Sequence, residues 1–145
     1  MQPYPHHYTV SASASPTGDV VLSSQGLPDL PSAPPAEFDG PGDKWSPETL
    51  LLGALADCYV LTFRAVAKAS QLPYRDIRCT AKGKLDRQDR VARFVELDLD
   101  VALTLPPEVS EEDVKKACDK AARGCIISNS LGVQPTTKLS FQRAS

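Results

Sequence analysis

The residues that decide the fold are 44–70, which read K-W-S-P-E-T-L-L-L-G-A-L-A-D-C-Y-V-L-T-F-R-A-V-A-K-A-S. Ser46 is a good N-cap residue, and Pro47 suits the first helical position because its missing N–H would have no helical partner there. Glu48 places a negative charge at the positive end of the helix dipole. The stretch therefore predicts one long helix that begins at Pro47 and runs to Ser70.

Apolar side chains lie on nearly every side of this predicted helix, not along a single stripe. A helix of this kind is buried, either in a large core or between subunits. Asp57, Arg64 and Lys68 interrupt the apolar run, and ionisable side chains are expensive in lipid, so we do not expect a membrane span. Cys58 lies near the middle of the helix and is the first candidate for chemistry.

The chain of 145 residues has the size of one ordinary domain. We expect a single domain over 1–145, made of an N-terminal hairpin and proline-rich segment (1–43), the central helix (44–70) and a C-terminal part (71–145). A net charge of -2 provides no basic field, so neither nucleic acid nor an anionic membrane is an expected partner. The N-terminus shows no basic region followed by an apolar core, which favours the cytoplasm.

The rest of the chain predicts two hairpins. Residues 8–15 alternate larger with small polar side chains, and a turn at 16–19 leads into a second short strand. The proline-rich stretch 27–38 predicts an extended edge segment. Residues 76–87 and 91–105 alternate apolar with polar side chains, as half-exposed strands do, so they predict a second hairpin with a charged turn at 86–90.

A second helix and a last strand complete the order. Ser110 precedes three acidic residues, which is typical of a helix start, and Gly124 is well placed to end that helix. A short turn or helical piece follows Cys125, and residues 133–141 read as a strand. The order predicts α+β architecture with a mainly antiparallel sheet. Because such a sheet covers one side of the central helix, we expect a second copy of the chain to cover the rest.

Four cysteines lack the close spacing of zinc ribbons or thioredoxin-like motifs, so a zinc–thiolate site is a distant hypothesis. Cys79 on the apolar side of a strand and Cys118 on the apolar face of a helix read as core residues. Cys58 has polar neighbours in an apolar helix, and Cys125 follows a glycine at a turn where a new helix begins. A thiol at such a position can have a lowered pKa. The residues alone leave a redox pair and a structural pair equally open.

Two segments together resemble a known family. S46-P-E-T-L-L-L-G-A-L-A-D-C58 and G124-C-I-I-S-N-S-L131 are similar to motifs of the OsmC/Ohr family, the osmotically inducible and organic hydroperoxide resistance proteins. The likeness covers roughly residues 44 to 141. It implies an α+β homodimer of intertwined chains, with two long central helices back to back and sheets packed around them.

The resemblance also implies a chemistry. Cys58 corresponds to the peroxidatic cysteine, which is oxidised to a sulfenic acid by an organic hydroperoxide, and Cys125 to the resolving cysteine that forms a disulfide with it. A dithiol such as a dihydrolipoyl group would restore both thiols, and no metal, haem or flavin cofactor is implied. The alternative from another class is a non-catalytic dimer of the same fold that binds a small hydrophobic ligand near Cys58.

By the same resemblance, Glu48 is the active-site glutamate that orients an arginine beside the thiolate. Its position at a helix start explains it equally well as a helix-dipole residue. Ten residues of continuous helix span about 15 Å, so Glu48 and Cys58 share a site only if the helix breaks, for instance at Gly53, or if a partner subunit brings them together. The arginine of the peroxidase members has no counterpart in the N-terminal hairpin, since the first arginine here is Arg64.

Overall fold

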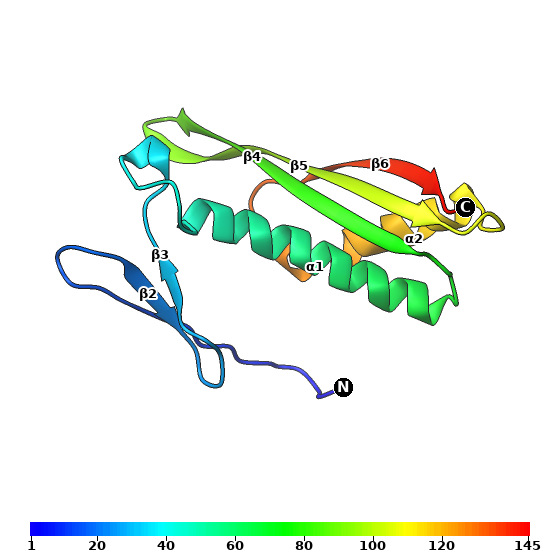
Figure 1. The fold of residues 1–145 in the computed structure, drawn as a ribbon, viewed down its shortest axis with the longest axis horizontal. Coiled ribbons are helices and arrows are strands. Elements are labelled where there is room, and N and C mark those ends of the chain that lie inside the picture. The colour runs from blue at the N-terminus through cyan, green and yellow to red at the C-terminus, as the bar shows by residue number, and fades with distance from the viewer. The chain divides into compact units, whose positions relative to one another are not determined.

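The computed structural model describes residues 1–145, which form two compact units, Met1–Leu50 and Leu51–Ser145 (Figure 1). The first unit contains a three-stranded antiparallel sheet in the order β1-β2-β3 and a short 3-10 helix. Its elements are β1 (Ser11–Ser13), β2 (Val20–Ser23), β3 (Leu30–Ser32) and η1 (Ala36–Phe38). A single domain over the whole chain stays a prediction.

The N-terminal hairpin is present, but its first strand is shorter than the predicted 8–15. All of β1 is exposed, so no buried face holds a longer alternating strand in register. The proline-rich segment supplies β3, in which Pro31 lies opposite Val21 of β2. Because β3 is an edge strand, the missing N–H of Pro31 does not interrupt a central ladder. The predicted edge segment is thus confirmed.

The long helix α1 (Pro47–Ala69) begins at the predicted residue. The Ser46 hydroxyl accepts a hydrogen bond from the Thr49 backbone N–H at 3.2 Å, and the Thr49 hydroxyl accepts one from the Ser46 N–H at 2.9 Å. Two N–H groups that the helix leaves without partners are therefore satisfied by side chains. The predicted N-cap is confirmed.

The second unit is built on a sheet in the order β4-β5-β6, with β4 (Asp76–Gln88), β5 (Val91–Leu105) and β6 (Thr136–Arg143). β4 and β5 form the predicted antiparallel hairpin. Because β4 extends to Gln88, the turn is shorter than the predicted 86–90. β6 pairs with β5 in parallel, whereas the pairings β1-β2, β2-β3 and β4-β5 are antiparallel, so the prediction of a mainly antiparallel arrangement is confirmed. The chain crosses over through helices between β5 and β6, and a crossover of that kind brings the next strand back in the same direction.

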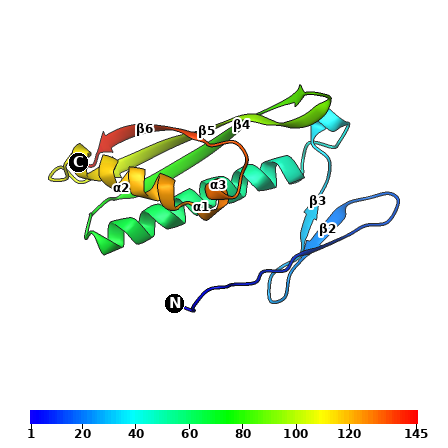
Figure 2. The same ribbon diagram turned by 180° about the vertical axis from the view of Figure 1, so that it is seen from behind.

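Two helices cover the same face of this sheet (Figures 1 and 2). They are α1 and α2 (Glu111–Gly124), and the one-turn helix α3 (Ile126–Asn129) follows α2 directly. Ser110 caps α2 by accepting a hydrogen bond from the Asp113 N–H at 3.4 Å, as predicted. The core lies between the sheet and the helices. Its largest fully buried side chains are Tyr59, Phe63, Leu55, Leu103, Leu105, Val101 and Val114.

Only one stripe of α1 is buried by the chain itself. Leu55, Tyr59, Phe63 and Ala67 recur at every fourth position and face the core, whereas Leu61 is 52% exposed. Length and composition alone would also let α1 cross a membrane, a property that it shares with the central helices of many soluble proteins. The chain thus leaves part of the apolar surface of α1 uncovered. This agrees with the sequence, in which apolar residues lie on nearly every side of the helix.

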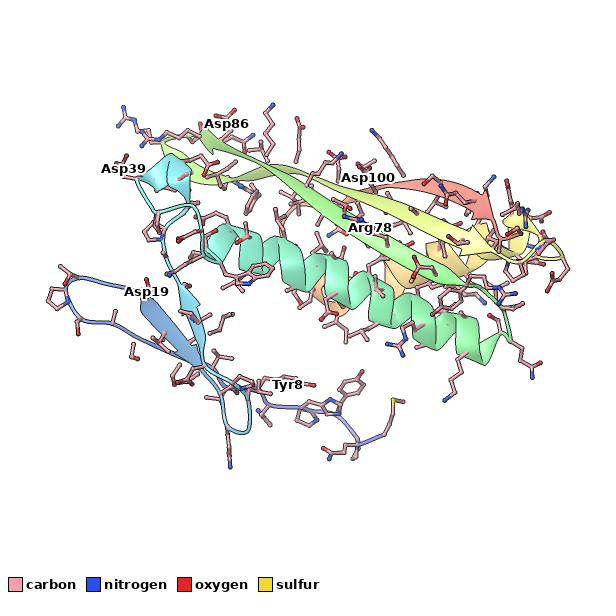
Figure 3. The ribbon with its side chains drawn as sticks, in the orientation of Figure 1. Tyr8, Asp19, Asp39, Arg78, Asp86 and Asp100 are labelled. Carbon is pink, nitrogen blue, oxygen red and sulfur yellow. The ribbon has the colours of Figure 1, made fainter.

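The opposite face of the β4-β5-β6 sheet is charged. Figure 3 labels Arg78 on β4 and Asp100 on β5, two strands that are direct neighbours. The Lys82 ammonium lies 2.6 Å from a carboxylate oxygen of Asp100. Apolar residues of the same strands alternate with these side chains and face the helices, so the predicted half-exposed character of the hairpin is confirmed.

Candidate functional site

Cys58 lies near the middle of α1 and is half-buried. Thr62, one turn further along the helix, donates a hydrogen bond from its hydroxyl to the Cys58 carbonyl oxygen at 2.7 Å. The same hydroxyl lies 4.0 Å from the Cys58 sulfur, within the range of a weak hydrogen bond to sulfur. The helix therefore presents the thiol beside a fixed hydroxyl group.

Gly124 brings a second thiol to this part of α1. It is the last residue of α2, and a Cβ atom at this position would lie only 3.3 Å from the Cγ2 methyl of Thr62. Cys125 follows in an extended conformation and serves as both the C-cap of α2 and the N-cap of α3. The sequence identified Gly124 only as the end of a helix. Its second role, to let the corner between α2 and α3 approach α1, depends on a contact between residues far apart in the chain.

The structure brings Cys58 and Cys125 together, and their surroundings act differently on the two thiols. Burial raises the pKa of Cys58, but hydrogen bonds from the Ile127 backbone N–H, the Cys125 thiol, the Thr62 hydroxyl and the Ile126 backbone N–H outweigh it. The pKa of Cys58 is therefore lowered. A lowered pKa means that more of this thiol is present as the reactive thiolate at neutral pH.

The pKa of Cys125 is raised, first because the residue is almost completely buried and further because its thiol donates toward the Cys58 sulfur. No cationic side chain is among the groups that shift either thiol. Arg64 is exposed on α1, and the Arg93 guanidinium lies beside Gly132. Backbone N–H groups at the start of α3, and not a cationic side chain, are therefore among the donors that lower the pKa of Cys58.

Cys79 and Cys118 lie against and within the core, as the sequence indicates for structural cysteines. Burial, and after it electrostatic repulsion by Cys125 when it ionises and by Asp100, raise the pKa of Cys79 to about 11. Burial also raises the pKa of Cys118, whose carbonyl oxygen accepts a hydrogen bond from the buried Tyr59 hydroxyl at 3.4 Å. Neither thiol is activated, so Cys58 alone among the four cysteines has a lowered pKa.

Glu48 lies in the first turn of α1, and the helix continues through Gly53 without a break. Ten residues of continuous helix correspond to a rise of about 15 Å, so α1 by itself does not bring Glu48 to Cys58. One carboxylate oxygen, Oε2, is buried without a hydrogen-bond partner. The one lysine of Met1–Leu50, Lys44, is paired with Asp19 at 3.5 Å, and this unit contains no arginine. Glu48 takes part in none of the ion pairs of the chain.

The side chains that could bind a metal ion do not cluster. No group of three or more histidine, cysteine, aspartate or glutamate side chains is arranged to hold one. His6 makes a 3.0 Å contact to the Gln2 carbonyl oxygen in the exposed N-terminal segment. The two adjacent thiols are the chemically distinctive group of the molecule.

Comparison with known proteins identifies the family. The sequence model of the family described as "OsmC-like protein" matches residues 40–140, a range that includes Glu48, Cys58 and Cys125. The chain is 32% identical over 100 residues to the uncharacterized protein YmaD of Bacillus subtilis, a match that covers 67% of each chain.

Solved structures share the fold. An OsmC-like protein of unknown function from Vibrio cholerae superposes with a TM-score of 0.86 at 13% identity, over 94% of this chain and 100% of the other. An organic hydroperoxide resistance protein from Elizabethkingia anophelis does so with a TM-score of 0.81 at 18% identity, over 97% of this chain and 100% of the other. At such identities these likenesses show the fold alone.

Fold and site together define an α+β protein in which a long helix and the turn after a second helix place two cysteines side by side. The chain belongs to the OsmC/Ohr family.

The lowered pKa of Cys58 predicts selective alkylation by iodoacetamide. Because only the thiolate reacts, Cys58 should be modified first at pH 7, and its rate should rise with pH to a plateau whose midpoint lies below that of free cysteine. Cys79 and Cys118, with raised pKa values, should react only on unfolding or at high pH. Peptide mass spectrometry over a pH series measures all four sites. A midpoint at or above that of free cysteine would contradict the assignment.

The close approach at Gly124 makes a second prediction. Gly124→Ala should push the corner that carries Cys125 away from α1, because the new Cβ meets the Thr62 methyl. We expect disulfide formation between Cys58 and Cys125 in diamide to slow about ten-fold, since small displacements of reacting groups cost about that much. Adding Thr62→Ser, which removes the methyl and keeps the hydroxyl, should restore most of the rate. Equal slowing in the single and double variants would show that this contact is not the cause.

Proposed function

We propose that this protein is a thiol-dependent peroxidase that reduces organic hydroperoxides to alcohols. The observation that carries the proposal is the pairing of a half-buried Cys58 of lowered pKa with a neighbouring Cys125 of raised pKa. The first acts as the nucleophile and the second remains protonated until it is needed. The name "organic hydroperoxide resistance protein" borne by structural relatives supports the choice of substrate.

The proposed reaction cycle has three steps. The Cys58 thiolate attacks one oxygen of the hydroperoxide, the O–O bond breaks, Cys58 becomes a sulfenic acid, and the alkoxide leaves as an alcohol after taking up a proton. The Cys125 sulfur then attacks the sulfenic sulfur, and the hydroxyl group leaves as water after taking up the thiol proton. A disulfide between the two cysteines results. A dithiol, itself oxidised to a disulfide, returns two electrons and two protons to the enzyme.

In this proposal the thiolate is activated by backbone, in place of the arginine that peroxidase members of the family carry. The Ile126 and Ile127 N–H groups and the Thr62 hydroxyl are the groups that support it. Backbone donors are held by the chain itself, so they need no reorganisation when charge develops on sulfur. A site of this kind is weaker than one with a full positive charge nearby, and we infer slower turnover than in arginine-containing relatives.

We further propose that the working form is a homodimer. The exposed apolar surface of α1 supports it, because large apolar surfaces on soluble proteins mark interfaces. The unpartnered Oε2 of Glu48 supports it as well, since a buried carboxylate oxygen costs free energy until a donor or cation reaches it. In the dimer we propose that a donor or cation of the partner subunit pairs with this carboxylate.

The peroxidase proposal predicts consumption of cumene hydroperoxide in the presence of dihydrolipoamide. Cys58→Ser should lose at least about a thousand-fold of the rate, because no other thiol in the chain is activated. Cys125→Ser should use one hydroperoxide to form the sulfenic acid and then, with a second and a third, accumulate sulfinic or sulfonic acid on Cys58, because no thiol of the chain traps the sulfenic acid. A peroxide-consumption assay with non-reducing mass spectrometry measures both.

The same assay separates the alternative function. A non-catalytic dimer that only binds a small hydrophobic ligand would consume no hydroperoxide, and wild type and Cys58→Ser would behave alike. Cys79→Ser is the matched control: it removes a thiol of raised pKa and should leave the rate unchanged. Oxidised Cys58 without any disulfide to Cys125 in the wild type would remove Cys125 from the resolving role.

The dimer proposal predicts that Leu61→Lys weakens self-association. Leu61 is 52% exposed on α1, so the lysine would be tolerated in the isolated chain, but an unpaired charge in an apolar interface costs at least about ten-fold in affinity. Sedimentation velocity over a concentration series measures the shift toward monomer. Ala69→Lys, which adds the same charge at the exposed end of the helix, is the control. A monomeric wild type at micromolar concentration would refute the proposal.

A further inference from the structure

Thr62 lies one turn after Cys58 on α1 and has a neighbour on each side of the thiol pair. Its hydroxyl donates a hydrogen bond to the Cys58 carbonyl oxygen at 2.7 Å, and the same hydroxyl oxygen lies 4.0 Å from the Cys58 sulfur. Its methyl group lies 3.3 Å from the position that a Cβ atom would take at Gly124, the residue before Cys125. One branch of this half-buried side chain thus faces the reactive thiol, and the other faces the corner that carries the second thiol.

A single torsion angle fixes both branches of Thr62. A threonine in a helix can bond the carbonyl oxygen four residues earlier, and that bond selects the staggered position of its hydroxyl oxygen. Both branches stem from the same Cβ atom, so the methyl group has to take another staggered position. In this structure that position faces Gly124. The bond to the Cys58 carbonyl oxygen therefore places the oxygen beside the sulfur and the methyl group beside the corner at once.

The Thr62 hydroxyl can serve both protonation states of Cys58. A hydroxyl has one proton to donate and two lone pairs that accept. While its proton lies on the Cys58 carbonyl oxygen, a lone pair can accept from the thiol S–H group. After Cys58 ionises, rotation of the O–H bond turns the same proton toward the sulfur at 4.0 Å. This exchange moves no heavy atom.

Hydrogen bonds brace the corner between α2 and α3 as one piece. The Asn129 side-chain amide donates to the Arg123 carbonyl oxygen, and the Asn129 backbone N–H donates to the Cys125 carbonyl oxygen, both at 3.0 Å. The two bonds enclose Gly124, so a displacement of Gly124 displaces Cys125 with it. The spacing between Gly124 and the Thr62 methyl group therefore affects the distance between the two sulfurs.

We propose that Thr62 is a positioning residue for the thiol pair: its hydroxyl holds the Cys58 sulfur, and its methyl group sets how closely the corner with Cys125 approaches that sulfur. The proposal rests on the redox pair of the proposed function and adds the side chain that governs the resolving step. Thr62 forms no covalent bond in the cycle. It shortens the time that a sulfenic acid on Cys58 waits for Cys125, which limits further oxidation of Cys58.

The resolving step can be followed with diamide in place of a hydroperoxide. The Cys58 thiolate adds to the N=N bond of diamide, and the Cys125 sulfur then displaces the reduced diamide and forms the disulfide. The diamide leaves as a hydrazine, which has taken up the two electrons and two protons of the thiols. At saturating diamide, closure by Cys125 limits the rate, so this rate reports the approach of the two sulfurs.

Two substitutions separate the branches of Thr62. Thr62→Val keeps the branched shape and removes the oxygen. We expect it to raise the midpoint of the alkylation pH profile of Cys58 by about half a unit, the effect of one weak hydrogen bond, and to leave closure unchanged. Thr62→Ser keeps the oxygen and removes the methyl group. It should leave the midpoint unchanged and slow closure about three- to ten-fold, because the corner loses its spacer. In Gly124→Ala the new Cβ atom occupies the space that the methyl group leaves, which is why the two changes together should compensate.

Ser70→Ala is the matched control. The Ser70 hydroxyl donates the same kind of bond, to the Val66 carbonyl oxygen at 2.8 Å, near the exposed end of α1. Its loss should change neither the midpoint nor closure. A midpoint that Thr62→Val leaves unchanged would overturn the role of the hydroxyl, and closure that Thr62→Ser leaves unchanged would overturn the role of the methyl group.

Each variant tests one branch by itself, so the proposal remains open to refutation if one of them does not fold. Neither alkylation nor diamide closure uses a hydroperoxide. Absence of hydroperoxide consumption with the expected midpoints and closure rates would refute the peroxidase and leave the role of Thr62 standing. The reverse result, consumption of hydroperoxide with no effect of either Thr62 variant, would refute the positioning role alone.

Discussion

The contact between Gly124 and Thr62 is the constraint on which the candidate site depends. A Cβ atom at Gly124 would lie 3.3 Å from the Thr62 methyl, so a larger residue at the end of α2 would crowd the middle of α1. From that point the chain turns at Cys125 into α3, whose first N–H groups face the Cys58 sulfur. The close approach at Gly124 and the turn at Cys125 thus bring the second thiol and the α3 N–H groups to the same part of α1.

The result is a pair of thiols whose pKa values differ. The difference comes from burial and hydrogen bonds and not from a nearby cation. Burial disfavours the charged form of each, but only Cys58 receives enough hydrogen bonds to overcome it. The same asymmetry serves both halves of the proposed cycle. It makes Cys58 the nucleophile toward peroxide and keeps Cys125 protonated until the sulfenic acid forms.

Two groups are unsatisfied within a single chain: the outer apolar faces of α1 and the buried Oε2 of Glu48. The sheet and α2 of the second unit fully bury the stripe from Leu55 to Ala67, cover Leu52, Cys58 and Val66 in part and leave Leu61 52% exposed. Surface and carboxylate lie on one helix, so a single partner on that helix would satisfy both. The proposed dimer follows from these two needs and not from a contact seen in the structure.

The sequence by itself determined the elements and the candidate thiols, because these depend on neighbours along the chain. Ser46 and Pro47 set the start of α1, Ser110 set that of α2, and alternation marked β4 and β5. Tertiary structure decided what depends on residues far apart. It made β6 parallel to β5, placed Cys125 against Cys58, and gave Gly124 a packing role that no local pattern reveals. Spacing along a chain limits which residues can meet, but only the packing of whole elements decides which of them do.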